Sequence, residues 1–254
     1  MPYEFRASAL IAATVVLTAA SAAPGSAAEI RVLSANALNI AERNLAADFT
    51  KNSGQQVSFV FGSPGQVEQR LKAGEAYDVV IMPAQAAAAH DKDWRPESRH
   101  PFARVGIGLA VREGTKLDLS TVESTRKALL EARSITVSDS STGGLSGPNA
   151  QKVLANLGIA DAVKPKLVLS ASGQDQIAKG EVDIGLFNVS EIPRAKGVIM
   201  AGPVPASVQV YINYDAAIPA GSTAVEPALA LLKYLTSPSA RPRWQAAGLE
   251  LAGD

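Results

Sequence analysis

The first half of the chain repeats one local pattern, in which an apolar stretch of strand type ends in a short polar loop and a helix follows. The strand-type stretches are residues 30–33, 57–61 and 77–82. After the first of them, Leu38, Ala41 and later apolar residues recur at helical spacing. Three such units in succession predict a parallel-rich α/β sheet with flanking helices. In open sheets of this kind, ligands bind outside the carboxyl ends of the strands, where the loops gather.

The loop richest in small polar residues spans residues 138–149 and reads SDSSTGGLSGPN. It stands between an apolar stretch, residues 134–137, and a helical pattern, residues 150–157. Backbone N–H groups and hydroxyls would converge there, and a helix N-terminus adds partial positive charge. The expected ligand of such a loop is therefore an anion or a carboxylate. For a single loop of this composition, a flexible surface connection is the alternative interpretation.

Four further short polar segments occupy corresponding places after strand-type stretches. They are residues 34–37, 62–65 and 170–173, together with Asn188. None of them contains Lys or Arg, and loops with hydroxyls and backbone N–H groups can bind an oxyanion by hydrogen bonds alone. The recurrence favours a shared binding site over a set of unrelated surface connections.

A long strand-type run from residue 102 to 111 contains Gly106 and Gly108, and it is a suitable place for the chain to cross into a second domain. Residues 198–205 are broken by glycine and proline, and residues 208–212 are expected to form the strand that returns. We therefore expect domain I at residues 29–104 and 208–254, and domain II at residues 105–207.

The N-terminal residues 1–28 have the features of a cleaved signal peptide. Arg6 precedes an apolar run, and Ser26-Ala27-Ala28 fits the small-residue cleavage rule. A membrane anchor is the competing interpretation, but the apolar run is short of the ~20 residues that a spanning helix needs. The prediction is a protein exported to the periplasm. The chain has no Cys, so disulfides and thiol catalysis are excluded.

The remaining composition argues against several other chemistries. Lys plus Arg equal Asp plus Glu at 24 each, so a nucleic-acid partner is not expected. The two histidines are ten residues apart in a chain without Cys, which predicts no metal site, and no cofactor is expected. Residues 144–147, GLSG, resemble part of the nucleophile motif of a serine hydrolase, but Pro148 replaces its final Gly and both histidines precede Ser146. A hydrolase is thus a less favoured alternative.

Four segments resemble the periplasmic molybdate-binding proteins of ABC importers: residues 29–38, 61–65, 72–80 and 180–188. The resemblance covers almost all of the chain after the signal peptide. It implies a two-domain type II periplasmic-binding-protein fold with a two-crossing hinge. It also implies a non-enzymatic monomer that binds a small molybdate- or tungstate-like oxyanion between the domains and presents it to an ABC permease in the inner membrane.

The chain departs from that family at Ala37 and Pro64, where hydroxyl-bearing Ser residues are usual, and at Asn188, where Tyr is frequent. These losses make a small carboxylate or another polar solute the alternative ligand. The residues expected to contact the ligand are Asn36, Ala37, Ser63, Thr142, Gly143, Ser172 and Asn188.

Overall fold

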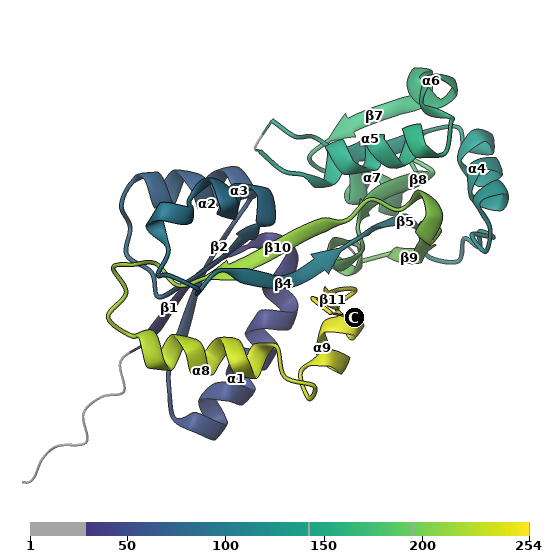
Figure 1. Ribbon diagram of the computed structural model, residues 1–254. Coiled ribbons are helices and arrows are strands. Elements are labelled where there is room, and N and C mark those ends of the chain that lie inside the picture. The colour runs from purple at the N-terminus through teal and green to yellow at the C-terminus, as the bar shows by residue number, and fades with distance from the viewer. Residues whose placement is uncertain (1–28, 142, 195, 254) are drawn as a thin grey trace, which may run out of the picture.

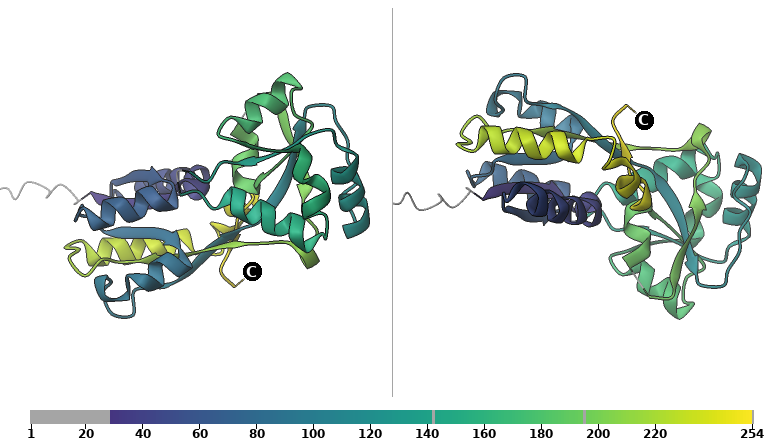
Figure 2. Two further views of the ribbon diagram at one scale, coloured as in Figure 1. Left: turned by 90° about the horizontal axis from the view of Figure 1, so that it is seen from above. Right: turned by 90° about the horizontal axis from the view of Figure 1, so that it is seen from below.

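The computed structural model describes residues 29–141, 143–194 and 196–253. The predicted signal peptide, residues 1–28, lies outside the described residues. The described chain forms two β-sheets, each with its own helices, and the views in Figures 1 and 2 show them side by side along the molecule. The predicted two-domain α/β fold is therefore confirmed.

The first sheet has the strand order β11-β4-β10-β3-β1-β2. β1 pairs in parallel with β2 and β3, whereas β10 pairs antiparallel with both β3 and β4. The strands are β1 (Ile30–Ala35), β2 (Val57–Gly62), β3 (Val79–Pro83), β4 (His100–Val105), β10 (Ile212–Ala217) and β11 (Glu250–Leu251). The accompanying helices are α1 (Asn39–Ser53), α2 (Pro64–Lys72), α3 (Ala84–Ala89), α8 (Val225–Leu235) and α9 (Arg241–Ala246).

The second sheet has the order β7-β6-β8-β5-β9, with parallel pairing around β6 and antiparallel pairing around β5. The strands are β5 (Ile107–Arg112), β6 (Ile135–Ser138), β7 (Leu167–Ser170), β8 (Ile184–Asn188) and β9 (Val198–Pro203). The helices are α4 (Val122–Glu131), α5 (Ser146–Asn156), α6 (Ala160–Val163) and α7 (Gly173–Lys179). Both sheets are thus mixed rather than predominantly parallel.

Each sheet buries apolar side chains on both faces, because successive residues of a strand point to opposite sides. In β1, Val32 joins the core under α1 and α8, whereas its neighbour Leu33 joins the core under α2 and α3. The second sheet likewise packs one face against α4 and α5, and Ile177 of α7 lies in the core of the other face. This layering places every loop that follows β1, β2, β6 or β8 at an edge where the two sheets face each other.

The chain crosses between the sheets twice, and one glutamine ties the two crossings together. Gly106 separates β4 from β5, so the predicted long strand is divided between the sheets. The Gln209 side chain accepts a hydrogen bond from Ile107 N at 2.7 Å and donates one to Ile107 O at 2.9 Å. This amide pairs with the backbone as a strand residue would, and it fixes the hinge between the two domains.

Two expectations for the returning segment were wrong. Residues 198–203 form the edge strand β9 instead of a broken segment, since the edge of a sheet tolerates Pro203 at the strand end. The returning strand is Ile212–Ala217 instead of residues 208–212. Residues before it include the 3-10 helix η5 (Ala206–Val208), and the hydrogen bonds of Gln209 replace strand pairing there.

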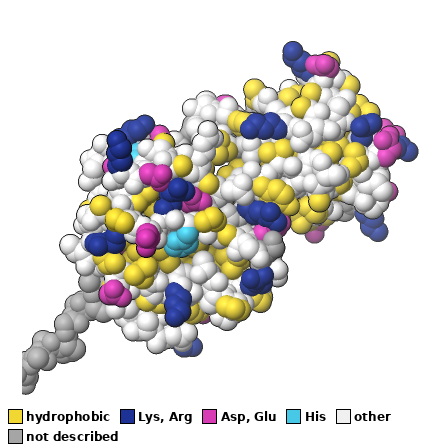
Figure 3. Space-filling model, in the orientation of Figure 1, with side chains coloured by type: hydrophobic (Ala, Val, Ile, Leu, Met, Phe, Trp, Pro, Cys, Tyr) yellow, Lys and Arg dark blue, Asp and Glu magenta, His cyan; other side chains and the backbone are white. Residues whose placement is uncertain are grey.

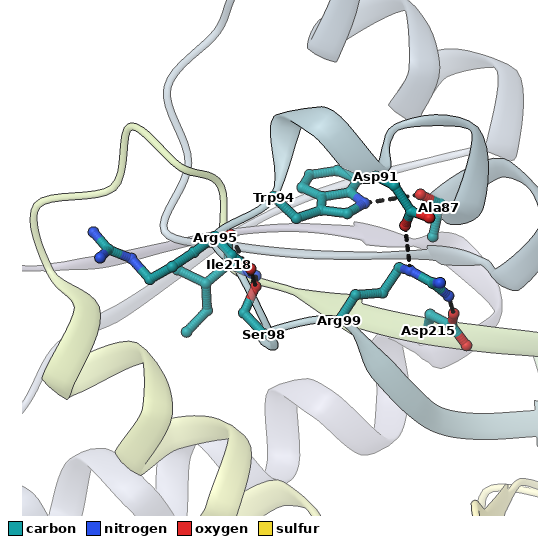
Figure 4. Close-up of polar contacts among 8 residues, drawn as sticks. All are labelled: Ala87, Asp91, Trp94, Arg95, Ser98, Arg99, Asp215 and Ile218. Carbon is teal, nitrogen blue, oxygen red and sulfur yellow. Dashed lines mark hydrogen bonds and ion pairs between the residues drawn. The ribbon is translucent and has the colours of Figure 1, made fainter.

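The polar connection that precedes β4 is fastened to the sheet (Figure 4). The indole Nε1 of Trp94 donates a hydrogen bond to Ala87 O in α3 at 2.8 Å. Arg99 forms ion pairs with Asp91, in the same polar connection, and with Asp215, in β10. Because Asp215 is only 4% exposed, this arginine compensates a buried carboxylate within β10, the strand by which the chain returns from the second domain.

Candidate ligand-binding site

The loops that follow β1, β2, β6 and β8 meet around one cavity of about 170 Å³ between the two sheets. Residues of both domains contribute to it, together with β10. The lining residues are Ala35, Asn36, Ala37, Ser63, Pro64, Ser138, Asp139, Gly144, Leu145, Ser146, Asn188, Glu191, Ile212 and Tyr214.

The two sides of this cavity are in direct contact. The loop after β6 extends from the second sheet toward α2 (Figure 1), and a Cβ placed on Gly143 would lie 3.1 Å from Gly65 Cα. Leu145 and Val189, both from the second domain, pack against the core of the first. These contacts place the cavity between the two domains.

The predicted site residues divide into three groups. Four of them line the 170 Å³ cavity: Asn36, Ala37, Ser63 and Asn188. Ser172 lines a second cavity of about 290 Å³, which shares Ser138 and Glu191 with the first and therefore adjoins it. Gly143 lies at the contact with Gly65, and Thr142 lies outside the described residues. Ligand contact stays a prediction for all seven.

Ser63 is held in place by the start of α2. Its Oγ accepts a hydrogen bond from Gln66 N, and its own N–H donates to Gln66 Oε1 at 2.8 Å. This reciprocal capping box, followed by Pro64 at the first helical position, sets the direction in which the helix begins. The proline that departs from the molybdate-binding pattern therefore has a structural role here.

Ser146 links the start of α5 to the end of β8. Its Oγ, which is buried, accepts a hydrogen bond from Asn188 N at 3.1 Å. The next residue, Gly147, cannot be replaced by a residue with a side chain, because a Cβ there would lie 2.0 Å from Ser138 O. The glycine lets the helix start directly against the end of β6, which positions Ser138, Ser146 and Asn188 around one space.

The Asn188 side chain is 3% exposed and lines the cavity. Its Oδ1 has no hydrogen-bond partner among the residues that the structure describes. Native proteins pair nearly all buried polar atoms, and leaving one unpaired costs about 1–3 kcal/mol. An unpaired amide oxygen on a residue that lines a cavity therefore points to a group that binds there.

A buried acid lies behind the wall of the first domain. Ser34 Oγ donates to Glu42 Oε1 at 2.9 Å, and both side chains are fully buried. Burial raises the pKa of Glu42 to about 8, although the bond from Ser34 and the charge of Arg43 act against the rise. Burial also raises the pKa of Tyr214, which lines the cavity, and the nearby carboxylates of Glu191 and Glu42 add to the rise.

The charged groups in the lining are acidic. Asp139 and Glu191 line the 170 Å³ cavity, and no described Lys or Arg lines this cavity or the adjoining one. Asp139 accepts hydrogen bonds from the backbone and hydroxyl of Ser141. Any anion bound in these cavities is therefore held by dipoles and hydrogen bonds rather than by a cation. On the outer face shown in Figure 3, by contrast, positive and negative side chains are interspersed over both domains.

Sequence reasoning missed Asp139, Glu191, Tyr214 and Ser146 as lining residues. Asp139 was visible inside the loop of residues 138–149, and its charge was a usable signal. Nothing in the sequence pattern marks Tyr214, because it enters the site from a strand whose position depends on long-range pairing.

Other chemistries find little support in the described part of the chain. No group of three or more His, Asp or Glu side chains there could hold a metal ion. No described histidine lines either cavity, so a hydrolase pairing of Ser146 with a histidine is not found. Across the described residues, no helix is both long and apolar enough to cross a membrane.

Two α/β domains, a hinge of two crossings and a cavity between the strand-end loops define a solute-binding protein of the two-domain periplasmic class. Over residues 30–250, the chain matches the model of the family described as bacterial extracellular solute-binding protein. The chain belongs to this family, and the predicted relationship to periplasmic binding proteins is confirmed.

Individual relatives agree on the fold. A periplasmic molybdate-binding protein of Azotobacter vinelandii superposes with a TM-score of 0.69 at 24% identity, covering 87% of this chain and 98% of that one. The sulfate-binding protein SubI of Mycobacterium tuberculosis H37Rv gives a TM-score of 0.65 at 17% identity, covering 89% and 87%. In sequence, an aconitate isomerase of a Pseudomonas species is 27% identical over an alignment of 235 residues, which covers 87% of this chain and 87% of that one.

Proposed function

We propose that this protein captures a small acid, an oxyanion or a carboxylate, in the cavity between its two domains. The observation that carries the proposal is the meeting of four strand-end loops, from two separate sheets, around a space of about 170 Å³. Binding is non-covalent and requires no catalytic residue. In this view, closure around the solute brings Gly143 against Gly65 and Leu145 against the first domain.

The class of ligand follows from the lining. Backbone N–H groups, hydroxyls and amides are supplied by residues 36–37, Ser63, Ser146 and Asn188, and such groups can hold an acid group without a cation. The related proteins that bind molybdate and sulfate use the same fold. The altered residues Ala37 and Pro64 favour a carboxylate alongside the inorganic oxyanions.

The solute captured by this protein would be taken up by transport across the inner membrane. Family membership supports a role as the capture component of an ABC importer, acting as a monomer in the periplasm and delivering its solute to a permease in the inner membrane. The N-terminal residues 1–28 would direct export and be removed.

A thermal-shift panel tests the proposal with molybdate, tungstate, sulfate and small mono-, di- and tricarboxylic acids. A ligand present at about 100 times its Kd adds about 2.7 kcal/mol of stability. For a protein of this size that raises Tm by roughly 5–10 °C. The Asn188→Leu variant should lose the shift, and Asn52→Leu, at an exposed position of α1, should keep it. Absence of any shift across the panel would refute the proposal.

A second candidate is an isomerase of small unsaturated carboxylic acids. Glu191 favours it, because this acidic residue lines both cavities, and so does the relative named aconitate isomerase. Glu191 would take a proton from a carbon next to the double bond and return it at the far end, so the double bond moves without a co-reactant. Conversion of an unsaturated acid into its double-bond isomer, followed by NMR and lost in Glu191→Gln, tests this. Unsaturated acids that bind without being converted would eliminate it.

A further inference from the structure

The second cavity, of about 290 Å³, lies on the second domain beside the proposed site. It adjoins the first cavity through Ser138 and Glu191, which line both. Its other polar lining comes from the end of β7 and the start of α7: Ser170, Ser172, Gln174 and Asp175. The two spaces are therefore neighbours, with Ser138 and Glu191 between them.

Gln174, which lines this second cavity, carries an unpaired acceptor. Its Nε2 donates to Glu191 O at 2.9 Å, and a carbonyl oxygen can only accept, so the bond fixes which end of the amide is oxygen. The remaining atom, Oε1, is buried and has no partner within the described residues. The wall of the second cavity thus contains one hydrogen-bond acceptor, Gln174 Oε1, that a donor group of a ligand could satisfy.

Asn188 adds a second acceptor of the same kind at the first cavity. Its side chain is 3% exposed, and Oδ1 lacks a partner in the described chain. The carboxylates of Asp139 and Glu191 line the same space, and carboxylates accept hydrogen bonds only. The wall formed by the second domain is therefore rich in acceptors.

We propose that the solute carries a hydrogen-bond donor, a hydroxyl or an ammonium group, in addition to its acid group. The proposal rests on the proposed function, and it narrows the solute to an organic acid with a donor substituent. A fully ionised tetrahedral oxyanion has no proton to give to Gln174 Oε1 or Asn188 Oδ1, and it would leave both unpaired. In a donor-bearing acid, the acid group occupies the space near Ser63 and the donor faces the amides of the second domain.

Isothermal titration of matched acids tests this inference. The sets are propionate, lactate and alanine; succinate, malate and aspartate; and propane-1,2,3-tricarboxylate with citrate. In at least one set the donor-bearing acid should bind tenfold or more tightly than its unsubstituted partner, a difference of about 1.4 kcal/mol. A hydroxy acid or an amino acid as the tighter ligand identifies the donor. Equal or tighter binding of every unsubstituted acid overturns the inference, as does binding of molybdate or sulfate alone.

Two variants assign the effect to the second cavity. Gln174→Met keeps the length of the side chain and removes the amide oxygen, so the preference for the donor should fall below about threefold while the unsubstituted acid binds as before. Gln176→Met is the matched control, since Gln176 Oε1 is also buried and unpaired but lines neither cavity. An unchanged preference in Gln174→Met contradicts the assignment. Absence of binding by every acid and oxyanion would instead remove the proposed function itself.

Discussion

Replacing Glu42 by Gln should make the protein more stable at neutral and alkaline pH. The wild-type side chain is fully buried, and its pKa is raised from an ordinary value of 4.5 to about 8 by burial. The amide of Gln is uncharged at every pH and keeps an oxygen that can accept the hydrogen bond from Ser34. The substitution therefore removes an ionisable group and preserves the main contact.

The sign follows from which state of the chain binds the proton more tightly. Between pH 4.5 and about 8, the unfolded chain has lost the proton of Glu42 and the folded protein retains it, so stability decreases as pH rises. The contribution of the neutral carboxyl is complete below pH 4.5 and is lost as pH approaches 8. Each pH unit is worth 1.36 kcal/mol, so the whole interval amounts to about 5 kcal/mol.

Urea denaturation of the wild type and of Glu42→Gln at pH 5, 6, 7, 8 and 9 measures this difference. We expect the variant to gain about 1.4 kcal/mol relative to the wild type for each unit from pH 5 to 8, and to gain little more above that. Glu123→Gln, at an exposed side chain, controls for the change in net charge. A difference that stays constant from pH 5 to 9 would show that Glu42 ionises alike in both states, and the reasoning would be wrong.

Two further substitutions test the scaffold of the site. Gly147→Ala would place a methyl group 2.0 Å from Ser138 O, so we expect a loss of about 1–3 kcal/mol in urea denaturation together with weaker ligand binding. Gly144→Ala, where nothing lies within 4 Å of the added atom, should change the free energy of unfolding by less than about 0.5 kcal/mol. Gln209→Leu removes both hydrogen bonds to Ile107, so stability should fall by about 1–3 kcal/mol and the Ile107 amide should exchange with solvent faster. Unchanged exchange at that amide would contradict a clamp at the hinge.

The sequence alone predicted the elements whose signals are local. The first strands and helices follow from apolar spacing and polar loops, and the structure places them close to the expected residues. The mixed character of both sheets was missed, because antiparallel pairing of β10 with β3 and β4 depends on residues far apart in the chain. The domain boundaries at 104/105 and 207/208 stay a prediction.

The candidate site shows the same division. Asn36, Ser63 and Asn188 could be chosen from sequence because each follows a strand-type stretch. Glu191 and Tyr214 could not, since one depends on the bend after β8 and the other on a strand that returns from the second domain. The expectation of loops without Lys or Arg agrees with the lining, but it overlooked Asp139 and Glu191, whose charge bears on the choice of ligand.

The place of β10 has a consequence for how the protein is made. This strand lies between β3 and β4 in the first sheet, yet its residues, Ile212–Ala217, come after the whole second sheet in the chain. During synthesis, the second domain can fold from contiguous residues. The edges of β3 and β4 that pair with β10 stay unpaired until β10 has been synthesised. Such edges recruit strands from other molecules. Truncation before Ile212 should therefore yield aggregates rather than a smaller soluble protein.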